Sequence, residues 1–189
     1  FKLISERTKY YSDREDALVF ETTIIPKESE IKSKPPTKAM KPLILAIESS
    51  CDETAAAIIG GDEKIVNSVV SSQIEFHSRF GGVVPEIASR KHIELISKVT
   101  NSTLEDCGLA WEDLAAIAVT YSPGLVGALV VGVAFAKGVA WSLDIPLIGV
   151  NHLEGHLYAN KMENEDIQPP ILVSLVSGGN TILVYVKDW

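Results

Sequence analysis

Cysteine is scarce in this sequence of 189 residues, and so are long apolar runs. Cys51 and Cys107 are too few to form the disulfide framework of a small secreted domain. Lys137 interrupts the longest apolar stretch, residues 125–143, and the uninterrupted part is too short to span a bilayer. We therefore expect a cytoplasmic protein with no membrane partner, in which residues 125–143 form a helix buried in a protein core.

Positive charge is scarce in most of the chain. The net charge is −8, and residues 1–41 hold nine of the 17 Lys/Arg but only seven of the 25 Asp/Glu. Residues 42–189 therefore carry a balance of −10. An acidic body binds a phosphate backbone poorly. If nucleic acid is a partner, other chains or further residues should supply much of the positive surface.

The composition divides the chain into three pieces. Residues 1–25 have the β-branched and aromatic residues of two strands around a polar turn, a hairpin too small to have its own core. Residues 26–42 hold four prolines among lysines and serines, which predicts a linker. Residues 43–189 form the body, a globular domain by composition.

The hydrophobic pattern of the body changes along its length. Three strands come first and suggest an antiparallel meander, and strands then alternate with helices. This order predicts an α/β fold with a mixed sheet flanked by helices. The expected strands are 42–50, 54–61, 64–74, 114–121, 146–150, 171–176 and 181–186, and the expected helices are 85–107, 125–143 and 151–161.

Three loops at predicted strand ends have sequences that suit ligand binding. Residues 48–54, ESSCDET, offer hydroxyls, amides and the acids Glu48, Asp52 and Glu53, which suit a phosphate or a metal but also a solvated turn. Residues 121–127, YSPGLVG, form either an anion site at a helix start or a tight turn. Residues 175–181, LVSGGNT, let a backbone approach a ligand or form a hairpin turn, without Walker or dinucleotide spacing.

Histidine is scarce too, with four in the chain, yet two of them lie in NHLEGH, residues 151–156. His152 and His156 are four positions apart, so a helix places them on one face, where they can reach one metal. A zincin peptidase needs glutamate directly after the first histidine, and Leu153 stands there. Two ligands do not close a site, so a metal site and two histidines that merely share a face both remain open.

The other histidines and the loop cysteine lack such a pattern. His77 and His92 have no partner at ligand spacing, so we expect surface or packing residues. Cys51 has no adjacent base, which argues against a nucleophile. Three spaced glycines are expected to permit close helix packing rather than to bind a ligand: Gly127, Gly132 and Gly138.

Five motifs taken together resemble the TsaD family, also called YgjD or Gcp, over residues 43–187. They are ILAIESSCDETAAAI, SSQIEFHSRFGGVVPEIASRKHIE, YSPGLVGALVVG, GVNHLEGHLYA and LVSGGNT. The resemblance implies an actin-like ATPase/sugar-kinase fold with two lobes around a nucleotide cleft, of which this chain holds the first lobe. It also implies transfer of a threonylcarbamoyl group from threonylcarbamoyl-adenylate to N6 of the adenosine beside the anticodon of tRNA, with TsaB and TsaE as partners.

The same resemblance implies roles for individual residues. His152 and His156 match two ligands of one divalent metal, iron or zinc, and Asp52 and Glu53 match acids near the reacting group. The third ligand, an aspartate, is expected outside this chain, which should be inactive alone. Ser174 and Leu175 stand where some family members have a tyrosine ligand. The adenylate site is matched by Leu175, Val176, Ser177, Gly178 and Gly179.

The front piece resembles another family. Residues 1–21 are similar to the last strands of a RimI-type GNAT acetyltransferase, with Tyr11 at the position of the tyrosine that protonates the leaving thiolate. The acetyl-CoA loop is absent, so no acetyl-CoA is expected here. The resemblance thus implies a RimI–TsaD fusion. Three alternative functions remain for the body: a metallo-endopeptidase, an actin-like-fold phosphotransferase and a non-catalytic TsaB-like scaffold.

Overall fold

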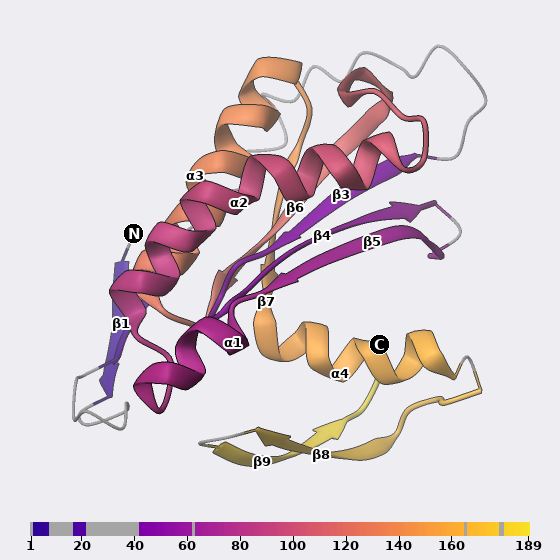
Figure 1. Cartoon of the computed structure of the whole chain (residues 1–189). Coiled ribbons are helices and arrows are strands. Elements are labelled where there is room, and N and C mark those ends of the chain that lie inside the picture. The colour runs from indigo at the N-terminus through magenta and orange to yellow at the C-terminus, as the bar shows by residue number, and fades with distance from the viewer. Residues whose placement is uncertain (1, 8–16, 22–41, 62, 165, 178–179) are drawn as a thin grey trace.

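A five-stranded sheet forms the centre of the protein (Figure 1). The computed structural model describes residues 2–7, 17–21, 42–61, 63–164, 166–177 and 180–189. The strand order is β5-β4-β3-β6-β7, in which β3, β6 and β7 run parallel and β4 and β5 antiparallel to their neighbours. The sheet is therefore mixed, as predicted. Its strands are β3 (Leu43–Glu48), β4 (Glu53–Gly60), β5 (Ile65–Ser72), β6 (Leu114–Ser122) and β7 (Leu147–Asn151).

The first three strands form the predicted antiparallel meander. Leu43 pairs with Gly60 and Glu48 with Ala55, so the ESSCDET loop closes a hairpin between β3 and β4. Side chains alternate across the sheet, and Leu45 and Ile47 point to the buried face while Glu48 points to the other. This alternation places an acid at the end of a central strand.

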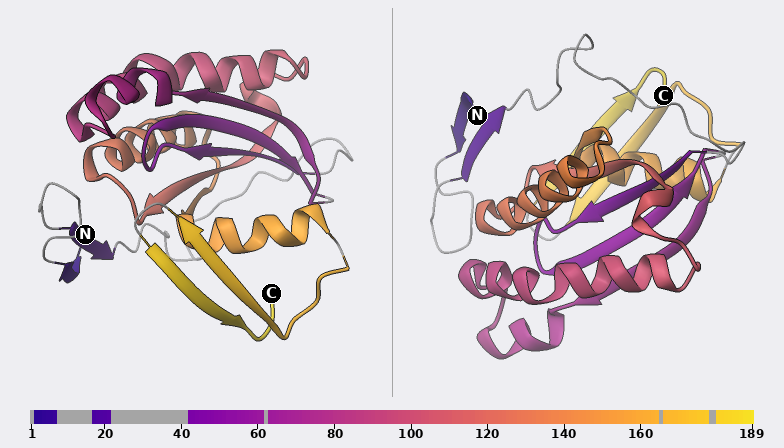
Figure 2. Two further views of the ribbon diagram at one scale, coloured as in Figure 1. Left: turned by 60° about the horizontal axis from the view of Figure 1, so that its bottom comes forward. Right: turned by 90° about the horizontal axis from the view of Figure 1, so that it is seen from above.

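Two long helices cover one face of the sheet (Figures 1 and 2). α2 (Pro85–Glu105) begins with proline in its first turn, where the missing N–H costs nothing, and α3 (Val126–Leu143) follows the turn after β6. The core lies between these helices and the sheet. Its buried members include Leu45, Ile58, Ile96, Leu104, Ile117, Val119, Val133 and Ala136.

The predicted helix at residues 125–143 exists, but it is buried on one side only, whereas the sequence predicted a helix buried in a protein core. α3 buries Ala128, Val133 and Ala136, but Val130 is 58% exposed and Trp141 is 88% exposed. The reason is that α3 packs on β6 and α2 with one face, and no other described segment covers its opposite face. By length and composition α3 could cross a membrane, a test that the core helix of a soluble protein also passes.

Two of the three spaced glycines permit close packing, as predicted. A Cβ at Gly127 would lie 2.4 Å from Ser89 Oγ of α2, and one at Gly132 would lie 2.3 Å from Ser49 Oγ. The prediction is wrong for Gly138, where a Cβ would meet no atom within 4 Å. Gly138 lies on the exposed side of α3 and needs no packing explanation.

α4 (His152–Glu163) and the last two strands lie on the other side of the sheet from α2 and α3 (Figure 2). β8 (Ile171–Ser177) and β9 (Asn180–Val186) pair antiparallel with each other and form their own sheet. The sequence pattern predicted both strands but not this separation. Three short elements were not predicted either: α1 (Ile74–His77), η2 (Ser78–Phe80) and η3 (Trp111–Asp113).

The predicted N-terminal hairpin is confirmed in its strands. β1 (Lys2–Arg7) and β2 (Ala17–Glu21) pair antiparallel. The expected turn, Tyr11 and nearly all of the predicted linker lie outside the described residues. The division into an acetyltransferase end, a linker and a TsaD-like body therefore stays a prediction.

Candidate metal centre

The loops after β3 and β6 meet at one edge of the sheet, because parallel strands end on the same side. Ser50 O accepts a hydrogen bond from Leu125 N at 2.7 Å, and Ser49 Oγ donates to Ala128 O at 3.0 Å. A Cβ at Gly124 would lie 2.5 Å from Ser50 O, so only glycine allows this approach. The Leu125 amide thus binds the loop after β3, and the choice between an anion site and a tight turn at the start of α3 stays open.

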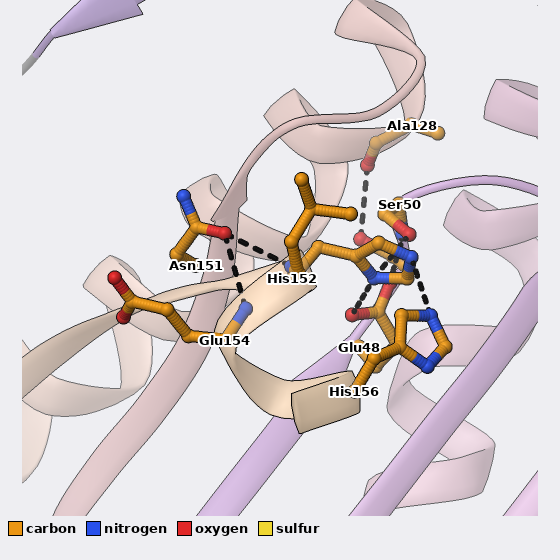
Figure 3. A network of polar contacts seen from close by, with 9 residues as sticks. Glu48, Ser50, Ala128, Asn151, His152, Glu154 and His156 are labelled. Carbon is orange, nitrogen blue, oxygen red and sulfur yellow. Dashed lines mark hydrogen bonds and ion pairs between the residues drawn. The ribbon is translucent and has the colours of Figure 1, made fainter. Parts of the chain in front are cut away.

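The two histidines begin a helix directly after β7. Asn151 ends this strand and caps α4, since its side-chain oxygen accepts from Leu153 N at 2.9 Å and Glu154 N at 3.4 Å. The cap fixes the direction of the first turn, and with it His152. Glu154 points away from the histidines (Figure 3), which agrees with the prediction that this motif is not a peptidase site.

His152 and His156 face each other across one turn of α4 (Figure 3). Their Nε2 atoms lie 3.0 Å apart, and their rings meet edge to face with centroids 4.5 Å apart. Two imidazoles on one tetrahedral metal, each at about 2.0–2.1 Å, would have nitrogens about 3.3 Å apart. The observed separation is close to this value, so the pair fits one divalent ion such as zinc or iron.

Glu48 is the carboxylate nearest to this pair. Its Oε2 lies 3.3 Å from His152 Nδ1, while Oε1 accepts a hydrogen bond from Ser50 N. Burial would raise the pKa of Glu48, but hydrogen bonds from His152, Ser50 and Thr120 outweigh it and lower the pKa to about 2. Glu48 is therefore ionised at neutral pH. A carboxylate behind an imidazole is the usual companion of a metal-bound histidine.

Sequence reasoning placed Glu48 in the loop but did not assign it to the site. The available signal was the alternation of β3, which turns Glu48 away from the core, together with its position at the end of a central parallel strand. What the sequence lacks is the direction of α4, which brings residues 104 positions apart into contact.

The surroundings of His156 favour the neutral form of its ring. Desolvation and the neighbouring His152 lower its pKa, against a smaller opposing effect of Glu48. A lower pKa favours the neutral ring, the form that binds metals. Among the described residues no group of three His, Cys, Asp or Glu side chains could hold an ion. The described part of the chain thus offers two histidines that one ion could share, and their role as ligands stays a prediction.

Asp52 and Glu53, the two other acids of the ESSCDET loop, lie close to Glu48 in sequence but have different surroundings. Asp52 is half-buried beside the Cys51 thiol, and Glu53 is exposed at the start of β4. Desolvation, followed by the charge and hydrogen bond of Asp52, raises the pKa of Cys51 to about 12. The thiol stays protonated, which agrees with the prediction that it is no nucleophile.

Among the residues predicted for the adenylate site, Leu175 contacts the helix of the histidines. It lines a small apolar cavity of about 40 Å³ together with Leu153 and Leu157 of α4. Val176 points the other way and is 75% exposed. Ser177 ends β8 and pairs with Asn180, whereas Gly178 and Gly179 lie outside the described residues.

The two remaining histidines are packing residues, one of the roles expected for them, and neither is on the surface. His92 Nδ1 lies 2.8 Å from Thr54 Oγ1, and its Nε2 lies 3.0 Å from Cys51 O. His77 Nε2 lies 3.1 Å from Gln73 Oε1. Both side chains are buried with these partners, so neither is available as a metal ligand.

The solved structures that resemble this fold include YeaZ from Pseudomonas aeruginosa. The TM-score is 0.52 at 16% identity, covering 77% of this chain and 65% of that one. At this identity the likeness concerns the fold alone, and it agrees with the actin-like fold expected from the sequence.

Curated relatives are much more similar in sequence. The chain is 57% identical over 149 residues to a tRNA N6-adenosine threonylcarbamoyltransferase of Clostridium perfringens, covering 79% of this chain and 44% of that protein. The protein of the same name from Clostridium kluyveri is 55% identical over 146 residues, which are 77% of this chain. The one from Clostridioides difficile is 54% identical over 147 residues, which are 78% of this chain. The chain spans less than half the length of these relatives, 43–44%.

One family model matches most of the body. It is described as TsaD, tRNA N6-adenosine threonylcarbamoyltransferase, and it matches residues 64–188. This range contains both histidines and the strand before SGGN, and the ESSCDET loop precedes it. The chain therefore belongs to the TsaD family.

Proposed function

We propose that this chain forms part of the site of a tRNA N6-adenosine threonylcarbamoyltransferase. The reaction would transfer a threonylcarbamoyl group from threonylcarbamoyl-adenylate to N6 of the adenosine beside the anticodon in tRNA. One observation carries the proposal: two imidazole nitrogens lie 3.0 Å apart beside an ionised carboxylate, within a chain of this family. The names of the relatives supply the reaction class.

His152 and His156 would hold the divalent metal, iron or zinc. When bound there, the ion would supply Lewis-acid polarisation of the carbonyl under attack. The fit rests on the separation of the two Nε2 atoms and on the lowered pKa of His156. A third ligand is expected from outside the described residues.

The loop carboxylates would handle the proton. The N6 amine attacks the threonylcarbamoyl carbonyl carbon, the bond to the phosphate oxygen breaks, and AMP leaves. The amine must lose one proton, and Asp52 or Glu53 would accept it, since both follow the strand that ends beside the histidines. Leu175, Val176, Ser177, Gly178 and Gly179 would line the adenylate, and Leu175 already contacts α4.

The proposed partners are tRNA and homologues of TsaB and TsaE. The balance of −10 over residues 42–189 supports a shared tRNA surface, because this segment alone offers little positive charge. The exposed side of α3, with Val130 and Trp141, is apolar enough to lie against another protein or segment.

A chimeric enzyme tests the proposal. This chain would replace the matching 149 residues of the C. perfringens relative. We expect the chimera to form threonylcarbamoyladenosine in tRNA, detected by mass spectrometry of nucleosides, and His152→Ala to reduce it at least about 100-fold. Adenylate binding should partly survive in that variant.

Glu86→Gln is the matched control, because Glu86 is exposed on α2 and its ion pair is with Arg90 one turn along the same helix. It should retain full modification. Undiminished threonylcarbamoyladenosine in the His152→Ala chimera would contradict the proposed function.

A further inference from the structure

We infer that Glu48 is a positioning residue that sets the tautomer of His152. It keeps the proton on Nδ1, so that the lone pair of Nε2 points at His156. The significance of this arrangement for metal binding rests on the proposed function, but the tautomer itself is a property of the metal-free chain.

The two oxygens of Glu48 face a backbone amide and a ring nitrogen, and the Ser50 and Thr120 hydroxyls also hydrogen-bond to this carboxylate. Oε1 accepts from the backbone amide of Ser50, a donor that cannot change its role. Oε2 lies 3.3 Å from His152 Nδ1. An ionised carboxylate can only accept hydrogen bonds, so a favourable contact requires the proton on Nδ1. A bare Nδ1 would place its lone pair against the carboxylate charge.

The Ser50 hydroxyl cannot fix the tautomer of His152. Its oxygen lies 3.2 Å from His152 Nδ1, but a hydroxyl both donates and accepts and rotates to suit its neighbours. With Nδ1–H in place, Ser50 can accept from the ring and donate to Glu48. Its role therefore follows the carboxylate.

The tautomer of His152 determines how the histidine pair interacts. With the proton on Nδ1, the Nε2 of His152 is an acceptor, and His156 must donate its own Nε2–H across the 3.0 Å contact. Binding of an ion would then require only His156 to change tautomer, with its Nε2 proton replaced by one on Nδ1, because His152 already presents a bare Nε2. With the opposite tautomer, the Nε2 of His152 would itself be blocked by a proton.

An isosteric substitution separates charge placement from shape. In Glu48→Gln the side-chain oxygen should stay on Ser50 N, because that donor is fixed, which turns the NH₂ group toward His152 Nδ1. A donor in that position forces Nδ1 to accept, so the proton moves to Nε2. The substitution thus reverses the tautomer of His152 while the side chain at position 48 keeps its size and shape.

Nitrogen-15 NMR of the histidine rings tests this directly in the metal-free 189-residue chain. At about pH 8, above the ordinary pKa of imidazole, long-range ¹⁵N–¹H spectra distinguish protonated from bare ring nitrogens. We expect protonated Nδ1 in His152 of the wild type and protonated Nε2 in Glu48→Gln. Ser50→Ala keeps the carboxylate and should keep the wild-type tautomer, and Glu86→Gln is the control for loss of a charge.

Zinc titration of the same variants measures how the tautomer of His152 affects zinc affinity. We expect Glu48→Gln to weaken zinc binding about 10- to 100-fold, and Glu86→Gln to leave it unchanged. A bare Nδ1 in wild-type His152, or an unchanged tautomer in Glu48→Gln, would overturn the inference.

If Glu48→Gln does not fold, the wild type and Ser50→Ala still test the inference. Loss of the Nδ1 proton in Ser50→Ala would assign the role to Ser50. Absence of zinc binding in the wild type with the expected tautomers would contradict the proposed metal site and leave the role of Glu48 supported.

Discussion

At the scale of single residues, His92 shows how a buried polar group is matched by its partners. It lies on α2 and is fully buried, yet both ring nitrogens have partners, Thr54 on β4 and the carbonyl of Cys51. Because a carbonyl can only accept, Nε2 carries the proton and Nδ1 accepts from the threonine. The neutral ring thereby holds the ESSCDET loop against α2, close to the carboxylates proposed for proton transfer.

His92 should make the stability of the chain depend on pH. Burial lowers its pKa below 6.5, more than the hydrogen bond to Cys51 raises it. Below about pH 6.5 the unfolded chain binds the proton more readily than the folded one. The free energy of unfolding therefore decreases as the pH is lowered, by at most about 1.4 kcal/mol per pH unit for one group. Denaturant titrations between about pH 7.5 and 5.5 measure this loss.

The comparison with His92→Gln isolates this residue, since His156 also has a lowered pKa and contributes with the same sign. We expect the variant to be less stable at pH 7.5 but to lose less stability on acidification. An equal loss in both proteins would show that His92 does not carry the dependence.

The sequence predicted the roles of individual residues unevenly. His152 and His156 could be paired because both lie on one helix, where spacing alone decides which side chains meet. Glu48 could not be assigned to them, since its contact depends on the path of the chain between β3 and α4. For His77 and His92 the sequence allowed a surface or a packing role, because the partners that bury them come from other elements.

At the scale of elements, α3 shows where composition is informative and where it is not. Its apolar sequence predicted a helix with correct bounds to within one residue, but not that one side would stay exposed. Hydrophobicity reports how much surface a helix can bury, whereas the number of layers around it depends on the rest of the fold. Short α1 was missed because four residues carry no periodicity.

A pair of glycine substitutions on α3 tests its packing against the ESSCDET loop. In Gly132→Ala the new Cβ would lie 2.3 Å from Ser49 Oγ, which is held by its bond to Ala128 O, so we expect a loss of about 1–3 kcal/mol in the free energy of unfolding. Gly138→Ala meets no atom within 4 Å and should stabilise the chain by about 0.4–1 kcal/mol. Urea denaturation of both variants measures the two effects, and equal signs would contradict the packing described.

At the scale of the whole molecule, the order of elements and the mixed sheet followed from the sequence pattern, because strands and helices alternate with clear periods. The separation of β8 and β9 from the central sheet did not follow, since pattern predicts a strand but not its partners. Their face that includes Leu172 and Leu183 is apolar and exposed, and a two-stranded hairpin alone is at best marginally stable in water. The curated relatives are more than twice as long as the matched part.

Zinc affinity in this chain and in the chimera with the C. perfringens relative tests whether His152 and His156 form part of a metal centre. We expect weak one-to-one binding by the chain, lost in His156→Ala, and binding at least about 10-fold tighter in the chimera, where a third ligand would join the pair. Competition with a chromogenic chelator measures both affinities. Zinc binding that is unchanged in His156→Ala, or equal in chain and chimera, would contradict the claim that these two histidines form part of a metal centre.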